Sequence, residues 1–136
     1  MSDHFEIISN ISKRKFLSHI LKFDNGYFIS ISEEELKIGS ISISLATTNQ
    51  SNTAKVIPDK NDQLFIDTLS KRISLMINGI CILSLFTKNK LHFEDMKKIN
   101  DKILKLLEDK KDEKNVKQKF RKKYKQSRKK KCFHLQ

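Results

Sequence analysis

The apolar residues of this chain change their spacing near Pro58, and that change limits the folds open to it. Before Pro58, apolar residues alternate with polar ones, most clearly over residues 40–45, and a period of two is typical of strands with one buried face. After Pro58, apolar residues recur every three or four positions, which is the period of an amphipathic helix. The first helical stripe comprises Phe65, Leu69, Ile73 and Met76.

The first half of the chain therefore predicts strands joined by short connections, which should pair antiparallel. Asp24, Asn25 and Gly26 indicate a turn, because Asn and Gly tolerate positive φ. The serine-bearing sides of these strands are expected to be wet or lightly packed. The run 80–86 is almost entirely apolar, which favours a strand covered on both faces. The expected strands cover residues 5–9, 16–23, 27–32, 40–45, 55–57 and 80–86.

Two helices are expected. The first begins at Asn61 or Asp62, either of which can cap a free backbone N–H, and ends at Gly79, which tolerates the left-handed conformation. The second begins near Phe93 and carries its own apolar stripe. The predicted fold class is α/β (α+β): an antiparallel sheet of about six strands with two amphipathic helices on one face, in the order β-β-β-β-β-α-β-α. The helical stripes either cover this sheet or pack partly against another subunit.

Charge divides the chain into a domain over residues 1–109 and a basic tail over residues 110–136. The domain holds 15 Lys+Arg and 14 Asp+Glu, whereas the tail holds 13 Lys+Arg and 2 acids. Such a tail is expected to be largely disordered in isolation. It could bind nucleic acid, an acidic protein or an anionic membrane, act as a nuclear import signal, or have no specific partner. Its basic clusters are Arg121, Lys122 and Lys123, and Arg128, Lys129, Lys130 and Lys131.

Catalytic and metal-binding motifs are not recognisable in the sequence. It has no GxSxG, HExxH, P-loop or GxGxxG pattern, and none of its four histidines has a His or Cys partner at metal-ligand spacing. Cys81 is expected to be a buried, poorly nucleophilic thiol. If His19 lies near it in the sheet, that proximity is expected to be due to chance and not to a catalytic pair. The acidic residues 33–35 are interpreted as a solvated strand end. The expectation is a non-enzymatic protein with no cofactor and no metal.

The start of the chain lacks a basic segment followed by an apolar one, so no signal peptide is expected. No apolar run approaches the ~18 residues of a membrane span, and we expect no membrane partner. Two cysteines cannot form a disulfide framework, which fits a reducing compartment. The predicted location is the cytoplasm, with the nucleus as a second location if the tail acts in import.

The order of the segments resembles the family of the third proteasome assembly chaperone. The resemblance is carried by KIGSISISL, a polar loop, AKVIPDKNDQLFIDTLSKRISLMINGICILSLF and FEDMKKINDKILKLL, and it covers roughly residues 5 to 108. The related fourth chaperone has the same kind of fold and remains an alternative. The resemblance implies a chaperone without enzymatic activity that helps to build the proteasome α-ring and then leaves it. The basic tail has no counterpart in the family.

The resemblance also implies partners and candidate sites. The expected partners are proteasome α-subunits and a second chain, either a copy or a related chaperone, with nucleic acid as an alternative partner of the tail alone. The family's mobile partner-binding loop corresponds to Ala46, Thr47, Thr48, Asn49, Gln50, Ser51, Asn52 and Thr53. The first candidates for the dimer interface are Phe65, Leu69, Arg72, Ile73, Met76, Ile99 and Ile103. For Leu69 and Ile73 an internal core position is the preferred interpretation.

Overall fold

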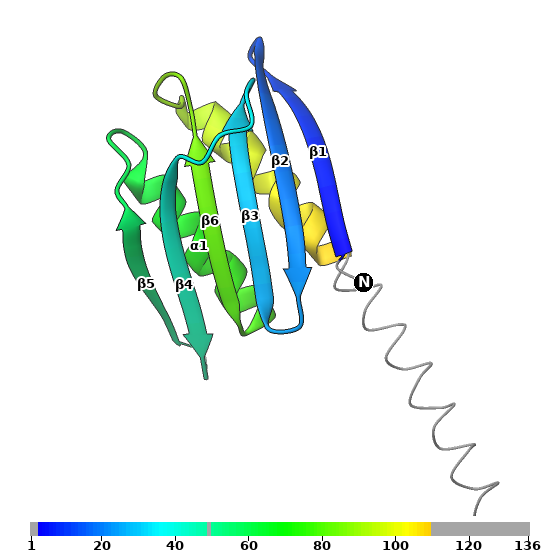
Figure 1. The fold of residues 1–136 in the computed structure, drawn as a ribbon, viewed down its shortest axis with the longest axis vertical. Coiled ribbons are helices and arrows are strands. Elements are labelled where there is room, and N and C mark those ends of the chain that lie inside the picture. The colour runs from blue at the N-terminus through cyan, green and yellow to red at the C-terminus, as the bar shows by residue number, and fades with distance from the viewer. Residues whose placement is uncertain (1–2, 49, 110–136) are drawn as a thin grey trace, which may run out of the picture. The chain divides into compact units, whose positions relative to one another are not determined.

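The computed structural model describes residues 3–48 and 50–109, which form a six-stranded sheet and two helices. The basic tail, and with it every predicted tail residue, lies outside the described residues. Packing divides the chain into Met1–Asn100 and Asp101–Gln136. The first unit contains the elements labelled in Figure 1, whose bounds are β1 Asp3–Ile11, β2 Arg14–Phe23, β3 Gly26–Glu33, β4 Ser40–Thr47, β5 Gln50–Ile57, α1 Gln63–Ile77 and β6 Ile80–Phe86.

The strands lie in the order β1-β2-β3-β6-β4-β5. Every neighbouring pair is antiparallel except β3 and β6, which run parallel. The predicted turn at Asp24 and Asn25 is confirmed, because Phe23 pairs with Gly26 across it. The α/β class and the order of the elements are also confirmed. The sheet is mixed rather than purely antiparallel, because β6 returns after α1 and inserts between β3 and β4.

The helix α1 packs on β4, β5 and β6. The second helix covers residues 93–109, and its first turns, over residues 93–100, lie on the same side of the sheet as α1 (Figure 1). The left-handed residue at the end of α1 is Asn78, with φ 50°, and not Gly79 as predicted. Neither helix, within the part of the chain that the structure describes, is long and apolar enough to cross a membrane.

Residues 46–53 form the end of a β-hairpin, and the prediction of a loop over this segment was wrong. Ala46 pairs with Ser51 and Thr47 with Gln50, so that only Thr48 and Asn49 lie between β4 and β5. The polar composition that suggested a loop has a different cause. Strand β5 lies at the sheet edge and is almost entirely exposed, so that it buries little side-chain surface and needs few apolar residues.

The apolar core lies between the sheet and the helices. Strands β2, β3 and β6 supply alternate apolar residues, and α1 supplies Ile66, Leu69 and Ile73. The apolar residues that recur with the helical period and those that alternate with the strand period are thus buried against each other, which confirms both patterns. The buried strand residues on this side include Phe16, Ile20, Ile29, Ile31, Cys81, Leu83 and Leu85.

Candidate protein-binding surface

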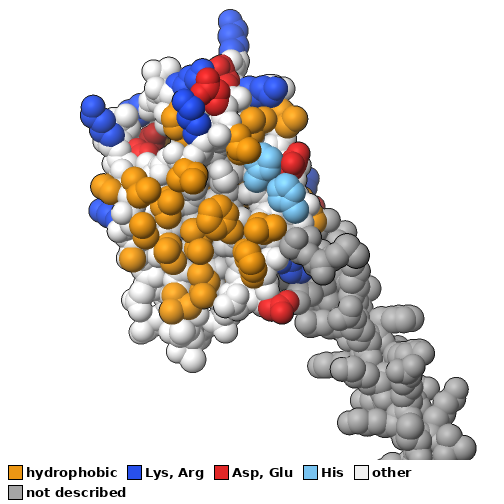
Figure 2. Space-filling view, in the orientation of Figure 1, with side chains coloured by type: hydrophobic (Ala, Val, Ile, Leu, Met, Phe, Trp, Pro, Cys, Tyr) orange, Lys and Arg blue, Asp and Glu red, His pale blue; other side chains and the backbone are white. Residues whose placement is uncertain are grey.

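The side of the sheet that faces away from the helices is apolar. Figure 2 views this open face and shows hydrophobic side chains spread across it. Strands β3, β6 and β4 place no charged side chain on it, since the residues that alternate outward are Phe, Ile, Leu, Ser and Thr. Its well-exposed large members include Ile8 at 63%, Phe23 at 53%, Leu45 at 45% and Phe28 at 36%. A continuous apolar surface of this kind marks an interaction site.

The apolar side of β4 faces outward because its serine side faces α1. Ser42 and Ser44 are fully buried. The Ser42 hydroxyl donates to Asp67 Oδ1 at 2.8 Å, and the Ser44 and Ser70 hydroxyls lie 2.8 Å apart. The expectation of a wet or lightly packed serine side is therefore wrong for β4. Hydrogen bonds satisfy these buried hydroxyls, and the isoleucines are left on the face that this chain does not cover.

The strand register aligns these outward residues in rows across the sheet. One row runs from Leu21 on β2 through Phe28 and Ile82 to Ile43 on β4. The next row contains Phe23 on β2, Ile80 on β6 and Leu45 on β4. Six strands of about eight residues give a face of roughly 25 by 25 Å, or roughly 600 Å². That approaches the ~800 Å² that each partner buries in a standard protein interface.

The connection between β3 and β4 folds over one end of the open face. The Ser32 hydroxyl donates to the Glu35 carbonyl and accepts a hydrogen bond from the Lys37 N–H. Lys37 Nζ lies 5.2 Å from the centre of the Phe86 ring. The turn leaves Leu36 and Ile38 largely exposed, at 65% and 75%. It therefore adds apolar side chains at the rim of the open face.

Histidines lie on β1 and β2, at the β1 edge of this face. His4 Nε2 is 3.3 Å from His19 Nδ1, and their rings stack with centroids 5.4 Å apart. Beside them is an open cavity of about 400 Å³, which Leu21, Phe28 and Ser30 also line. The sequence did not indicate this pair, because fifteen positions separate the two residues. Only the hairpin register between β1 and β2 brings them together.

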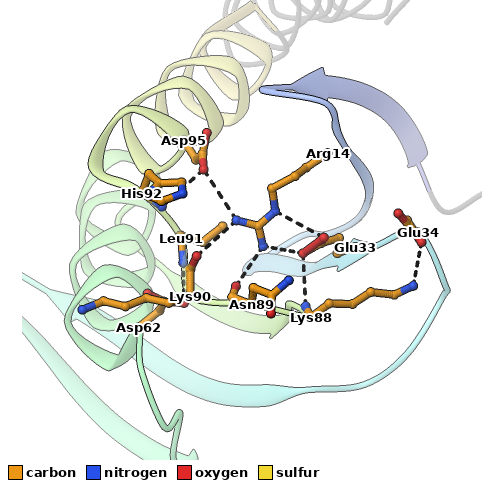
Figure 3. Close-up of polar contacts among 10 residues, drawn as sticks. All are labelled: Arg14, Glu33, Glu34, Asp62, Lys88, Asn89, Lys90, Leu91, His92 and Asp95. Atoms are coloured by element: carbon orange, nitrogen blue, oxygen red, sulfur yellow. Dashed lines mark hydrogen bonds and ion pairs between the residues drawn. The ribbon is translucent and has the colours of Figure 1, made fainter.

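A buried ion-pair cluster holds the connection between β6 and the second helix (Figure 3). Arg14 on β2 donates to both carboxylate oxygens of Glu33, at 2.5 and 3.2 Å. It also donates to the carbonyls of Asn89 and Lys90, and its Nη1 lies 3.5 Å from Asp95 Oδ2. The interpretation of residues 33–35 as a solvated strand end is thus wrong for Glu33, which is buried. Its role here is structural.

The protonation of this cluster gives a pH-dependent stability. Burial by itself would raise the pKa of Glu33, but hydrogen bonds from Arg14 and from the Lys88 N–H hold that pKa below its ordinary value of 4.5. Because the pKa of Glu33 is lower in the folded chain than in the unfolded chain, its ionised carboxylate stabilises the fold above pH 4.5. This stabilisation is lost as the pH falls through the folded-state pKa of Glu33. Glu33 therefore contributes most near neutral pH.

We expect Glu33→Gln to lower the free energy of unfolding at pH 7 by about 3 kcal/mol, because the buried Arg14 loses its bidentate carboxylate partner and keeps only Asp95, whose Oδ2 lies 3.5 Å from Nη1. Chemical denaturation measures this, and the gap from the wild type should narrow below pH 4.5. Glu34→Gln is the matched control: Glu34 pairs with Lys88 at the surface, where an ion pair contributes little. An equal loss in both variants, or a pH-independent loss in Glu33→Gln, contradicts the assignment.

The remaining predicted site residues fall into two groups. Leu69, Ile73, Ile99 and Ile103 are buried and offer no surface to a partner, so that the interpretation of Leu69 and Ile73 as core is confirmed. Arg72 is exposed, and Phe65 and Met76 are half-buried on α1.

Burial raises the pKa of the Cys81 thiol to about 12. Cys81 faces the helices and His19 faces the open side, so the two do not meet.

These features define a class: an α/β domain whose sheet is covered by its own helices on one side and presents an apolar face on the other. Neither a protein-family model nor a curated protein matches the sequence. A solved structure is similar, namely a chain from the crystal structure of a novel chaperone complex for yeast 20S proteasome assembly. The similarity has a TM-score of 0.56 and covers 77% of this chain and 95% of that chain, at 12% identity. It confirms a fold like that of the proteasome assembly chaperones.

Proposed function

We propose that this chain is a non-enzymatic chaperone that assists assembly of the 20S proteasome α-ring by transient protein binding. The observation that carries the proposal is the open face of the sheet, with Ile43 and Leu45 turned away from the helices while Ser42 and Ser44 are buried under α1. The similarity of fold to a chain of a yeast proteasome assembly complex supplies the biological context. Its partners are proteasome α-subunits and a second chaperone chain.

The open face is the proposed site of the second chain, which is another copy or a related chaperone. A second apolar sheet face is a suitable occupant, because sheets pack face to face about 10 Å apart and interdigitate their side chains. Strand β6 favours a second sheet as the partner. Its apolar residues point to both sides of the sheet, which is typical of a strand covered on both faces. This chain covers only the side that faces the helices. The proposed location is the cytoplasm, and the nucleus if the basic clusters serve in import.

The proposal is tested by affinity purification from nuclease-treated cell extract, with α-subunits identified by mass spectrometry. The full chain should recover proteasome α-subunits and a second chaperone chain in fixed proportion. A variant with Gln in place of the seven Lys and Arg residues of clusters 121–123 and 128–131 should recover the same partners, since the domain binds them. If neither chain recovers α-subunits, the proposal is wrong. If the recovered proteins are lost on nuclease treatment or with the Gln variant, binding depends on the tail and on nucleic acid instead.

A further inference from the structure

The hairpin of β1 and β2 assembles three metal-ligating side chains on the open face. Glu6 stands directly opposite His19 in the register, and His4 lies two positions before Glu6 on the same side of β1. Side chains two apart on one strand, and opposite or diagonal across an antiparallel pair, lie within reach of one another. The three residues therefore converge from backbone positions that the rigid hairpin holds.

The distances between the donor atoms suit one small cation. His4 Nε2 is 3.3 Å from His19 Nδ1, His19 Nδ1 is 3.6 Å from Glu6 Oε1, and all three ligand atoms lie within 4.8 Å of one another. In a tetrahedral zinc site the bonds are about 2.0 to 2.2 Å long, so neighbouring donors are about 3.3 to 3.6 Å apart. The two distances that include His19 already match that spacing, and the His4 and Glu6 donor atoms lie within 4.8 Å of each other.

We propose that His4, His19 and Glu6 bind one Zn²⁺ ion. Two imidazole nitrogens favour zinc or a similar transition metal over Mg²⁺ and Ca²⁺, which take oxygen ligands. Three protein ligands leave a fourth position for water or for a donor from another molecule. His4 and His19 also line the cavity formed with Leu21 and Phe28. The site does not depend on the proposed chaperone function, since one chain supplies all three ligands.

The test is titration of the untagged full-length chain with Zn²⁺ by calorimetry and with Co²⁺ by visible absorption. We expect one metal ion per chain and the absorption bands of four-coordinate cobalt. His4→Gln and His19→Gln should each weaken binding at least about 10-fold, because even the loss of an outer-sphere partner costs 10- to 100-fold. Glu6→Gln should also weaken it, since the substitution removes the anionic ligand. Circular dichroism checks that each variant is folded.

Two controls separate this site from other donors. His92→Gln removes an exposed histidine remote in sequence from the cluster and should leave the affinity unchanged. Cys132→Ser with His134→Gln removes the thiol and the imidazole of the tail and should also leave the affinity unchanged. The proposal is overturned if the chain binds no metal, if His4→Gln and His19→Gln bind as tightly as the wild type, or if binding is lost with the tail residues. In those cases the histidine pair is a stacked surface contact only.

Discussion

Gly39→Ala is expected to destabilise this protein severely. A Cβ atom at this position would lie 2.0 Å from the Leu85 carbonyl oxygen and 2.7 Å from Phe86 Cα. Both are backbone atoms of the central strand β6, so a side chain cannot rotate to make room. The backbone conformation is not the reason, because no glycine among the described residues has positive φ. The constraint is the close approach of two main chains.

We expect Gly39→Ala to lower the free energy of unfolding by at least about 4 kcal/mol, the range of severe steric and strain effects. For a domain of this size that corresponds to a Tm lower by roughly 15 to 30 °C. The neighbouring Ile38 is 75% exposed, so Ile38→Ala is the control and should leave the Tm of the isolated chain nearly unchanged. Thermal unfolding followed by circular dichroism compares the two. A Gly39→Ala protein as stable as the wild type would show that β6 is not held at this spacing.

The role of Gly39 illustrates what the sequence could not predict. Periodicity located most strands and both helices, because it depends on which side of an element is buried. The place of β6 between β3 and β4 depends instead on contacts between residues more than forty positions apart, such as Gly39 with Leu85. Gly26 repeats this arrangement on the other side, where a Cβ would lie 2.0 Å from the Ile80 carbonyl oxygen. No local pattern marks either approach.

The orientation of β4 was missed for a different reason. Alternation of Ile and Ser predicts a two-sided strand, but it does not tell which side meets the helices. The missing signal lay on α1, where Gln63, Asp67, Ser70 and Ser74 form a polar stripe at spacings of four, three and four. That stripe accepts and donates hydrogen bonds toward β4 and β5. Two facing polar stripes bury each other, so the apolar side of β4 remains open.

Leu45→Lys, on the open face, is the second substitution with a large expected effect. We expect it to dissociate the proposed second chain from this one. Leu45 is 45% exposed and lies in the apolar row formed with Ile80. Placing an ammonium group inside an apolar interface removes a buried contact and leaves a charge unpaired. Loss of one interface anchor of this kind costs about 2 to 4 kcal/mol, a weakening of at least about 30-fold. The fold should be retained, because the residue is exposed in the single chain.

Leu75→Lys is the matched control for this prediction. Leu75 lies on α1 and is 40% exposed, so the two substitutions change side chains of the same type and nearly the same exposure on opposite layers of the fold. Sedimentation equilibrium of the full chain, alone and with the chaperone chain recovered with it, gives the dissociation constants. Self-association that only Leu45→Lys weakens identifies a homodimer through the open face. Association only with the recovered chain, weakened in the same way, identifies a heterodimer.

The opposite result has an equally definite meaning. If Leu75→Lys dissociates the complex and Leu45→Lys does not, the partner binds the helical layer, where Phe65, Arg72 and Met76 are the predicted contacts. The apolar open face would then need another occupant, because six strands with isoleucine and phenylalanine turned to water are prone to non-specific association. Light scattering of the Leu45→Lys protein would detect this, since the substitution should then reduce aggregation and leave partner binding intact. The two leucines therefore decide which layer of the fold this protein uses to bind its partner.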